Sequence, residues 1–216
     1  MTVTARWLGH STVRIESSKA SFIIDPFVTG NPNAAARLDE LKADYVLLTH
    51  DHDDHAKDVE YFLKKGATFV GIHEHAVAWS EKGYKTEGMN IGGTITLGDA
   101  KIFMTHATHT SSVGLVAGFV IEVEERQIYH AGDTGLTYDM KILGEFYKID
   151  LAFLPIGDRY TMGASHAAIA ADWIGAKKVV PIHYLTWPPI AANVTQFRRL
   201  LGERSSVLTT GDTIKV

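Results

Sequence analysis

VLLTHDHDDH, residues 46–55, is the most informative stretch of this chain. It begins with an apolar, β-rich run that predicts a buried strand and ends in an unbroken series of His and Asp. His50 and His52 are two residues apart, so an extended chain points both imidazoles the same way. Asp54 and His55 follow at the start of a predicted helix, where they can face a neighbouring point. This spacing predicts two adjacent divalent ions, one held by each pair.

The alternative interpretation is a polar loop without metal, in which Asp53 or Asp54 caps a helix that starts at His55. Six consecutive His and Asp residues are far more than a cap needs, so the metal site is the stronger interpretation. Imidazole and carboxylate ligands suit Zn²⁺ best and also accept Mn²⁺, Fe²⁺ or Co²⁺. The absence of cysteine excludes disulfides, zinc–thiolate sites and cysteine nucleophiles.

The composition is that of a globular protein with a sizeable core, because 45% of the 216 residues are hydrophobic and 21% are charged. We expect one domain over residues 1–216, since no linker divides the chain. A net charge of −4 argues against a nucleic-acid partner. Charged residues interrupt the N-terminal segment and every long apolar run, so we expect neither a signal peptide nor a membrane span. The sequence predicts a cytoplasmic protein with a small-molecule substrate, and leaves a homo-oligomer open.

The pattern of elements predicts an α/β protein with two sheets. Strands are predicted at residues 3–8, 12–16, 21–24, 45–49, 68–72, 94–97, 101–105, 118–123, 127–130, 151–155, 178–182, 206–209 and 213–216. Helices are predicted at 55–65, 165–175 with Gly175 as its stop, and 191–201 with Asn193 or Thr195 as its cap. Each half of the chain reads as a meander followed by βα alternation. This favours two sheets in one layered domain over a single doubly wound sheet.

Several further motifs accompany the His/Asp stretch. They are LGHSTVRIE at 8–16, FIIDPFVTGNP at 22–32, NIGG at 90–93, YHAGDTGL at 129–136, FLPIGDRYTMG at 153–163 and VVPIHYLTWPPI at 179–190. Together with HDHDDH, they make nearly the whole chain resemble the metallo-β-lactamase superfamily. The resemblance is to its small metal-dependent hydrolases related to ascorbate-6-phosphate lactonase and, more distantly, to N-acyl phosphatidylethanolamine phospholipase D. The second Gly-Asp-Thr, at 211–213, is interpreted as a hairpin turn between two terminal strands.

The resemblance implies a four-layer αββα sandwich with two divalent metal ions, Zn²⁺ by preference, between the sheet edges. The ligands that it implies are His50 and His52 for the first ion, Asp54 and His55 for the second, Asp133 as the bridge between them, His109 and His183. His109 is selected by the pattern Ala-x-His-Thr. His106 lies three residues earlier, and strand alternation predicts that it faces away or contacts a ligand from behind.

Other residues are candidates for roles around the metals. His10, in the loop after the first strand, and His166 are candidate acids for the leaving group, beside Asp54 as a metal ligand that orients the attacking hydroxide. Asp25, Asp158 and Trp187 are predicted to support the ligands or line the pocket.

The sequence therefore predicts a dinuclear hydrolase that attacks a carbonyl or phosphorus centre with a metal-bridging hydroxide. A lactonase and a phosphodiesterase are the nearest alternatives, and only Arg6 and Arg159 are candidates for a phosphate pocket. Leu185, where the relatives carry Asn, and His166, where they carry an acid, put the relatives' substrates in doubt. A nuclease, a di-iron redox protein and a non-catalytic metal-binding module are weaker alternatives.

Overall fold

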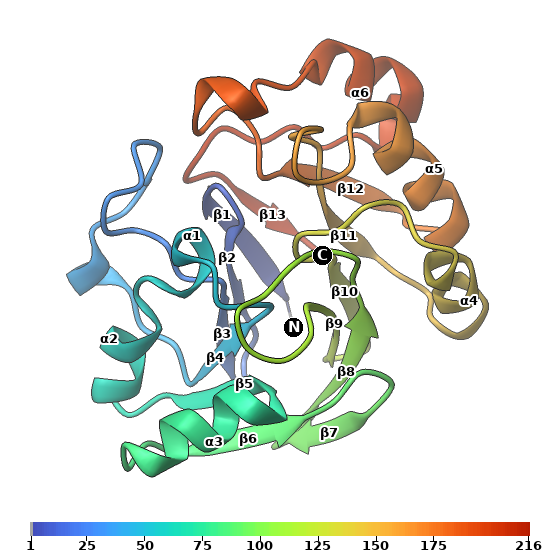
Figure 1. Cartoon of the computed structure of the whole chain (residues 1–216). Coiled ribbons are helices and arrows are strands. Elements are labelled where there is room, and N and C mark those ends of the chain that lie inside the picture. The colour runs from blue at the N-terminus through green and yellow to red at the C-terminus, as the bar shows by residue number, and fades with distance from the viewer. Residues whose placement is uncertain (1) are drawn as a thin grey trace.

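A computed structural model describes residues 2–216 as two mixed β-sheets packed face to face with helices on their outer sides (Figure 1). On the side of the first sheet lie α1 (Asp53–Ala56), α2 (Val59–Lys64) and α3 (His73–Glu81). On the side of the second lie α4 (Asp139–Phe146), α5 (Ala164–Ile174) and α6 (Val194–Leu201). Short 3₁₀ turns occupy Leu38–Glu40, Pro188–Ile190 and Gly202–Arg204. The predicted αββα sandwich is confirmed.

The first sheet has the strand order β13-β1-β2-β3-β4-β5-β6. Its strands are β1 (Thr4–Gly9), β2 (Thr12–Glu16), β3 (Ser21–Ile24), β4 (Tyr45–Leu48), β5 (Thr68–Ile72), β6 (Thr86–Met89) and β13 (Thr213–Lys215). The pairs from β13 to β3 are antiparallel, and those from β3 to β6 are parallel. The carboxyl ends of β3, β4 and β5 therefore meet at one edge of this sheet.

The second sheet has the order β12-β11-β10-β9-β8-β7. Its strands are β7 (Thr94–Leu97), β8 (Ala100–His106), β9 (Ala117–Val123), β10 (Arg126–His130), β11 (Leu151–Pro155) and β12 (Lys178–Ile182). It is an antiparallel meander from β7 to β10 and parallel from β10 to β12. Both halves of the chain thus repeat the meander followed by βα alternation that the sequence predicts.

The main hydrophobic core fills the space between the two sheets and continues beneath α4 and α5. Trp7 and Phe22 of the first sheet belong to the same buried cluster as Ile102 and Phe119 of the second. A smaller cluster, which includes Phe62, lies under α2 and α3. None of the helices in the described residues is long and apolar enough to cross a bilayer.

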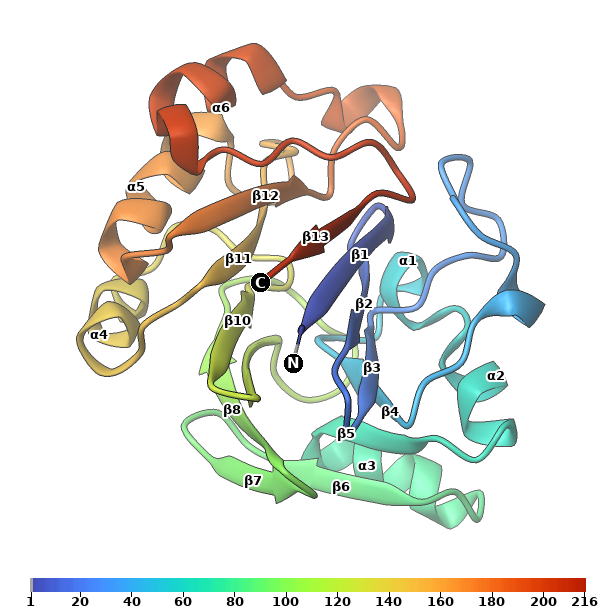
Figure 2. The ribbon, with the colours of Figure 1, turned by 180° about the vertical axis from the view of Figure 1, so that it is seen from behind.

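The C-terminal segment departs from the prediction. Residues 206–209 form no strand, so the Gly211–Asp212 turn does not close a hairpin. Instead Gly211 N donates to Trp7 O and Trp7 N donates to Asp212 O, which lays β13 beside β1. Figure 2 shows this strand returning from the second half of the chain to the first sheet. Its partner is over 200 residues away in sequence, beyond the reach of local turn chemistry.

The predicted helices differ from the structure in two places, one of which is the start of α6 at Val194 instead of residue 191. Helix 55–65 is divided into α1 and α2, and the N-cap of α1 is His52 without a side-chain bond, so neither Asp53 nor Asp54 is the cap. Between the two helices, Asp58 turns away to accept hydrogen bonds from Val28 N and Thr29 N. Gly175 ends α5 with a left-handed φ of 64°, and Asn193 caps α6 by accepting from Gln196 N, as predicted. The sequence did not predict β6 or α4.

Candidate metal centre

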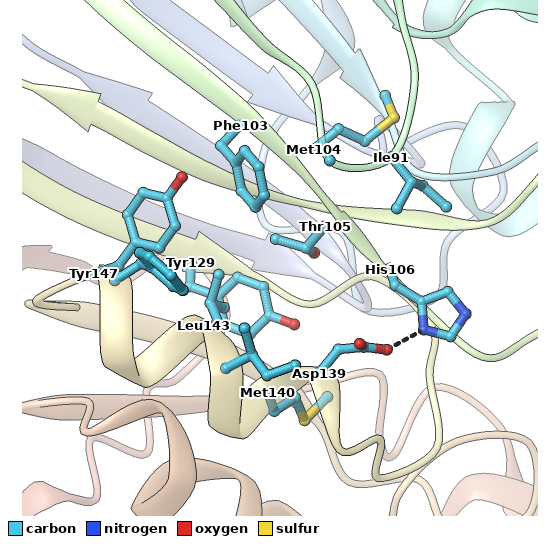
Figure 3. Close-up of a pocket in the computed structure, with 13 residues that line it drawn as sticks. Ile91, Phe103, Met104, Thr105, His106, Tyr129, Asp139, Met140, Leu143 and Tyr147 are labelled. Carbon is cyan, nitrogen blue, oxygen red and sulfur yellow. Dashed lines mark hydrogen bonds and ion pairs between the residues drawn. The ribbon is translucent and has the colours of Figure 1, made fainter.

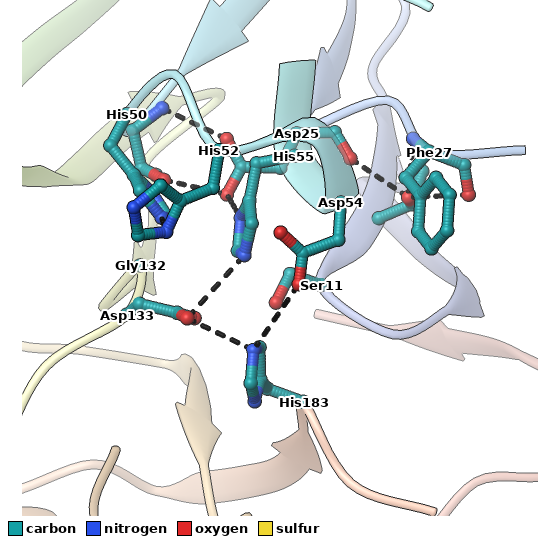
Figure 4. Close-up of polar contacts among 12 residues, drawn as sticks. Ser11, Asp25, Phe27, His50, His52, Asp54, His55, Gly132, Asp133 and His183 are labelled. Carbon is teal, nitrogen blue, oxygen red and sulfur yellow. Dashed lines mark hydrogen bonds and ion pairs between the residues drawn. The ribbon is translucent and has the colours of Figure 1, made fainter. Parts of the chain in front are cut away.

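The candidate metal centre lies where strands of both sheets end at the same side of the sandwich. His50 and His52 follow β4, and α1 carries Asp54 and His55. The remaining predicted ligands come from the second sheet: His109 after β8, Asp133 after β10 and His183 directly after β12. The structure brings all of them together (Figure 4 shows most of the group). Parallel strands place their carboxyl ends at one edge, which is why segments so distant in sequence meet here.

The predicted ligands form two groups around a shared carboxylate. His50, His52 and His109 offer nitrogen atoms that all lie within 4.8 Å of one another. The ring centroid of His109 is 5.3 Å from that of His50 and 5.2 Å from that of His52. This is the first group, and it consists of imidazoles alone.

The second group combines a carboxylate with imidazoles. Ligand atoms of Asp54, His55 and His183 lie within 4.8 Å of one another, together with one nitrogen of His10. His183 Nε2 is 3.9 Å from Asp54 Oδ2. His55 also offers a ligand atom within 4.8 Å of atoms of His50 and Asp133, so it lies between the two groups.

Asp133 lies between the two groups. Its Oδ2 is 2.9 Å from His183 Nε2, 3.5 Å from His55 Nε2 and 3.7 Å from His109 Nε2. The carboxylate therefore touches a member of each group, which is the geometry expected of a bridging ligand. The left-handed Gly132 before it has no room for a Cβ atom, which would lie 2.6 Å from Ala117 O.

Unpartnered buried atoms show that this residue set fits a divalent cation. His55 Nε2 and Asp133 Oδ1 are buried and have no hydrogen-bond partner. Buried polar atoms are almost always satisfied, so groups left open point to a ligand between them. Nitrogen and carboxylate oxygen donors without sulfur suit Zn²⁺, Mn²⁺, Fe²⁺ or Co²⁺.

Asp25 and Thr49 orient the imidazoles from behind. Asp25, fully buried at the end of β3, accepts from Thr49 N at 2.8 Å and from His55 Nδ1 at 2.8 Å. The Thr49 hydroxyl donates to Asp25 Oδ2 and so accepts from His50 Nδ1. These bonds favour the tautomer with an unprotonated Nε2 in both histidines, and the Nε2 of His50 lies 3.0 Å from His52 Nδ1. The sequence predicted that Asp25 supports the ligands or lines the pocket, and it did not predict a role for Thr49. The sequence feature that could have indicated Thr49 is its position between the strand and the His/Asp motif.

His10 is buried behind Asp54 and does not line the cavity. Its Nε2–H donates to Asp54 Oδ2 at 3.1 Å, and its Nδ1 accepts from the Thr186 hydroxyl at 2.8 Å. Its backbone carbonyl accepts from Trp7 Nε1 and from His183 N. The predicted role as an acid for the leaving group needs contact with substrate, whereas this placement supports Asp54.

Backbone strain concentrates at this centre. His10, Asp25 and His183 have φ values of 54°, 48° and 52°, in the left-handed region that non-glycine residues seldom adopt. Each follows the end of a strand and turns its side chain back toward the cluster. Such strained residues gather at functional sites because the surrounding structure holds them there.

Asp51 belongs to the His/Asp motif but points away from the cluster. Its Oδ1 accepts from Ser111 Oγ and from Ser112 N, both at 2.8 Å. These bonds fasten the loop that carries His109 to the loop that carries His50 and His52. The sequence did not predict this contact, because it joins residues about 60 positions apart.

The charges of the cluster are strongly coupled. Burial lowers the pKa of His50 to about 2 and that of His10 to about 4. Burial also disfavours the charge on His55, but the Asp133 and Asp25 carboxylates outweigh it and raise its pKa well above the usual value. Burial would raise the pKa of Asp133, whereas His183 and His55 hold it well below its usual range. A divalent cation at Asp133 therefore competes with a proton on His55.

A cavity of about 510 Å³ opens onto this centre. Members of both groups and the bridging Asp133 reach it, whereas His50 and His55 lie beneath its floor. Its other walls are Thr110, Tyr160, Trp187, Pro189 and Ile190, with no Lys or Arg among the lining residues. Trp187 thus lies in the pocket as predicted, and the apolar wall is the side available to a substrate.

Two predicted pocket residues lie elsewhere. Asp158 and His166 line a separate cavity at the start of α5, so the structure does not bring them to the candidate metal centre. Both are exposed to solvent. Their prediction rested on loop position, which does not tell which side of a loop faces the site.

Neither of the candidate phosphate-binding arginines is a lining residue of the cavity. Arg6 donates to the backbone carbonyls of Gly211 and Ala35, and the Arg159 guanidinium lies 5.6 Å from the ring centroid of Tyr160. Leu185 is 55% exposed and does not line the cavity. No basic phosphate pocket is therefore formed beside the centre by these residues.

His106 and His109 are separated by the end of β8. His106 is the last residue of that strand, and its Nδ1 donates to Asp139 Oδ2 at 2.8 Å. Asp139 is not one of the predicted metal ligands. His109 lies in the following loop, where strand alternation no longer applies. The expectation that His106 faces away holds, and the expectation of a contact with a ligand does not.

Comparison with known families places these features in context. The model of the beta-lactamase superfamily domain matches residues 21–184. A UPF0173 metal-dependent hydrolase from Exiguobacterium sp. is 44% identical over 220 residues, covering 97% of this chain and 98% of that protein. A UPF0173 metal-dependent hydrolase from Thermococcus onnurineus is 46% identical over 215 residues, covering 95% of each.

Solved structures agree with the fold. Igni18, a metallo hydrolase from Ignicoccus hospitalis, superposes with a TM-score of 0.95 at 35% identity over 100% of this chain and 99% of its own. The di-iron β-hydroxylase CmlA from Streptomyces venezuelae has a TM-score of 0.78 at 15% identity, with 99% of this chain matching 54% of that one. The second likeness shows the fold alone.

Proposed function

The chain belongs to the metallo-β-lactamase superfamily, among the UPF0173 metal-dependent hydrolases, and from this premise we propose that it hydrolyses small uncharged esters or lactones at a centre of two divalent ions. His50, His52 and His109 would hold the first ion, and Asp54, His55 and His183 would hold the second, with Asp133 between the two groups. We further propose that residues 1–216 act as one hydrolase domain, which is supported by the core shared between the sheets.

The observation that carries the dinuclear proposal is the position of Asp133. One carboxylate oxygen contacts histidines of both groups, and buried donor atoms beside it have no other partner. When bound, divalent ions supply Lewis acidity and lower the pKa of water toward neutrality. The nitrogen and oxygen donor set favours Zn²⁺, with Mn²⁺, Fe²⁺ and Co²⁺ as alternatives.

Asp54 is the proposed catalytic residue of the chain. It reaches the cavity, and its carboxylate accepts from His10 Nε2–H. Burial would raise the pKa of Asp54, but the His10 hydrogen bond and the charge of His55 hold it well below its usual range. Asp54 thus stays ionised and orients the attacking water. His10 is a positioning residue that fixes the carboxylate.

The cavity wall supports an uncharged substrate with an apolar part. Tyr160, Trp187, Pro189 and Ile190 offer ring and aliphatic surface, and no Lys or Arg among the lining residues would balance a phosphate. An ester or a lactone therefore fits better than a phosphodiester or a sugar phosphate. The same lack of basic residues disfavours a nuclease.

A substrate panel on the metal-loaded protein tests the reaction. Hydrolysis of neutral aryl esters and alkyl lactones, with bis-p-nitrophenyl phosphate at least tenfold slower, is the expected order. Trp187→Ala is expected to raise KM more than it lowers kcat, because it removes apolar contact and leaves the proposed ligands intact. Faster turnover of the phosphodiester would reject the substrate class, and iron-dependent oxidation without hydrolysis would favour the di-iron alternative.

Metal binding is tested with a buried carboxylate that is not itself a proposed ligand. Asp25→Asn weakens the hydrogen bond to His55 Nδ1, and we expect metal affinity to fall about 10- to 100-fold, as for other partners of metal-bound histidines. Asp58→Asn is the matched control, since Asp58 is also buried and, among the described residues, its carboxylate accepts only from the backbone N–H groups of Val28 and Thr29. Competition with a chromogenic chelator measures both. Equal affinity in the two variants would refute the proposed role of Asp25.

A further inference from the structure

A second cavity lies on the opposite side of the second sheet, away from the candidate metal centre. It encloses about 390 Å³ between α4 and the outer face of β8 and β10. Figure 3 shows aromatic rings and a thioether around it, among them Phe103, Tyr129, Tyr147 and Met140. Small-molecule sites occupy roughly 300–1,000 Å³ and are mainly apolar, so this cavity has room for a compact ligand.

The Tyr129 hydroxyl supplies a polar group at the wall of this cavity. The residue is 1% exposed, and its burial raises the pKa of the phenol to about 12. The Thr105 hydroxyl is its polar neighbour and lowers that pKa in part, and Thr105 Oγ1 is buried with no other partner. Figure 3 shows the Tyr129 hydroxyl directed toward the side of Met140 and Asp139. A phenol that donates to Thr105 keeps its acceptor sites, so an incoming hydroxyl group can donate to the Tyr129 oxygen.

The charge of the lining selects against ionic ligands. No Lys or Arg lines the cavity, and its acid and imidazole, Asp139 and His106, already bind each other at 2.8 Å. Aromatic and thioether surfaces favour a flat ring, through edge-to-face and sulfur–ring contacts. The chemistry on the wall therefore describes an uncharged aromatic molecule that carries one hydroxyl group.

Two hydrogen-bonded segments, residues 106–109 and 133–139, connect this cavity to the candidate metal centre. The His106–Asp139 bond lies at the cavity end of the pair, and the His109–Asp133 contact lies at the metal end. Between them, Gly135 N donates to Thr108 O at 3.2 Å, and Thr108 N donates to the Thr134 hydroxyl at 3.0 Å. A ligand that shifts the His106–Asp139 pair therefore moves segments that also hold two proposed metal ligands.

We propose that this cavity binds a small uncharged aromatic alcohol and that its occupancy alters the affinity of the metal centre. The binding part stands on the cavity alone, whereas the coupling rests on the proposed metal ligands. Coupling between two sites is reciprocal, so each ligand changes the affinity for the other by the same factor.

Fluorescence titration with 2-naphthol tests the binding site, with naphthalene as the matched probe that lacks the hydroxyl. Tyr129→Phe is expected to weaken 2-naphthol binding about tenfold, the scale of one lost hydrogen bond, and to leave naphthalene binding unchanged. Equal losses for both probes, or no loss for either, would overturn the assigned role of Tyr129. Since no substrate is used, failure here is distinct from failure of the proposed hydrolysis.

A blocking variant tests the location. Ile142→Trp, at a half-exposed lining residue of α4, is expected to abolish 2-naphthol binding by filling the cavity. Val77→Trp is the control, because Val77 is similarly exposed and its helix, α3, lies on the side of the first sheet. Saturable binding that survives Ile142→Trp would place the probe elsewhere and overturn the proposal. Sedimentation that shows this face covered by a second copy of the chain would overturn it too.

The coupling is tested by titrating 2-naphthol into metal-loaded and chelator-treated protein, with circular dichroism to confirm that both are folded. We expect the affinity for 2-naphthol to differ several-fold between the two forms. Thr134→Val removes the hydroxyl that accepts from Thr108 N, and this difference should vanish in that variant. Equal affinities in the loaded and metal-free protein would refute the communication between the two sites.

Discussion

At the residue scale, several side chains of the centre use one polar atom for a hydrogen bond within the protein. Their other polar atom is left to face the cluster. Asp25 fixes His55, Thr49 fixes His50, and Asp54 is held by His10. Each bond points the remaining nitrogen or oxygen into the cluster and leaves it without freedom to turn away. Such preorganisation removes an entropy loss that would otherwise accompany metal binding.

His10 makes folding sensitive to acid in the metal-free protein. Its pKa of about 4 in the folded state is below the ordinary 6.5, so the unfolded chain takes up the proton first. Its contribution to the free energy of unfolding is complete above pH 6.5 and is lost as the pH falls toward 4. We expect His10→Gln to reduce the pH slope in this window by up to about 1.4 kcal/mol per pH unit, the value for one proton.

Urea unfolding of the metal-free protein between pH 4.5 and 6.5 measures this slope. The comparison of wild type with His10→Gln isolates His10 from the opposing contribution of His55, whose pKa is raised. His73→Gln is the control, since that side chain is exposed at the start of α3. Identical slopes in wild type and His10→Gln would contradict the prediction.

At the element scale, α4 and α5 cross where one residue has no side chain. A Cβ atom on Gly144 of α4 would lie 2.0 Å from Trp173 O and 3.1 Å from the Ile174 Cα atom of α5. Both neighbours are backbone, so the helices would have to separate. The crossing therefore sets how closely α4 lies on the second sheet, and with it the shape of the cavity beneath α4.

Gly144→Ala is expected to lower the free energy of unfolding by about 1–3 kcal/mol, the usual range for overpacking, despite the better helix propensity of Ala. Gly135→Ala is the matched control, because its Cβ would have nothing within 4 Å. Chemical denaturation of the two variants provides the comparison. A Gly144→Ala variant as stable as wild type would mean that the helices can move apart freely.

At the scale of the whole molecule, the proposed metal ligands join the two sheets. His50, His52, Asp54 and His55 come from the first sheet, and His109, Asp133 and His183 from the second. Bound ions would thus act as cross-links between halves of the sandwich that are otherwise held together by the apolar core. Binding to the folded state alone stabilises that state by mass action.

Removal of metal by a chelator is expected to lower the unfolding free energy by about 2.7 kcal/mol when the free metal had been at 100 times its Kd. Hydrogen exchange should rise at the carboxyl ends of β4 and β12 and stay unchanged at β2, which carries no ligand. The His50→Ala/His183→Ala variant, without one ligand in each group, is the control and should not respond to the chelator. An equal response of both proteins would argue against these ligands.

Much of the molecule was predictable from local pattern. Strands such as Thr68–Ile72 and Leu151–Pro155 have the predicted bounds, because β-rich apolar runs between turns are local signals. β6 was missed since Thr86–Met89 is polar and contains glycine, and α4 since its Gly144 weakens the helical signal. Both are stabilised mainly by neighbours, α3 and β5 for the first and α5 for the second.

The sequence by itself determined the two-sheet architecture and gathered the His and Asp side chains of HDHDDH after one strand, because spacing and periodicity act over a few residues. Only the tertiary structure decided that His10 lies behind Asp54, that His166 lies in another cavity and that β13 joins β1. These facts depend on which side of a turn faces the site and which distant strand is adjacent. Such choices are made by packing of the whole core, which no local segment contains.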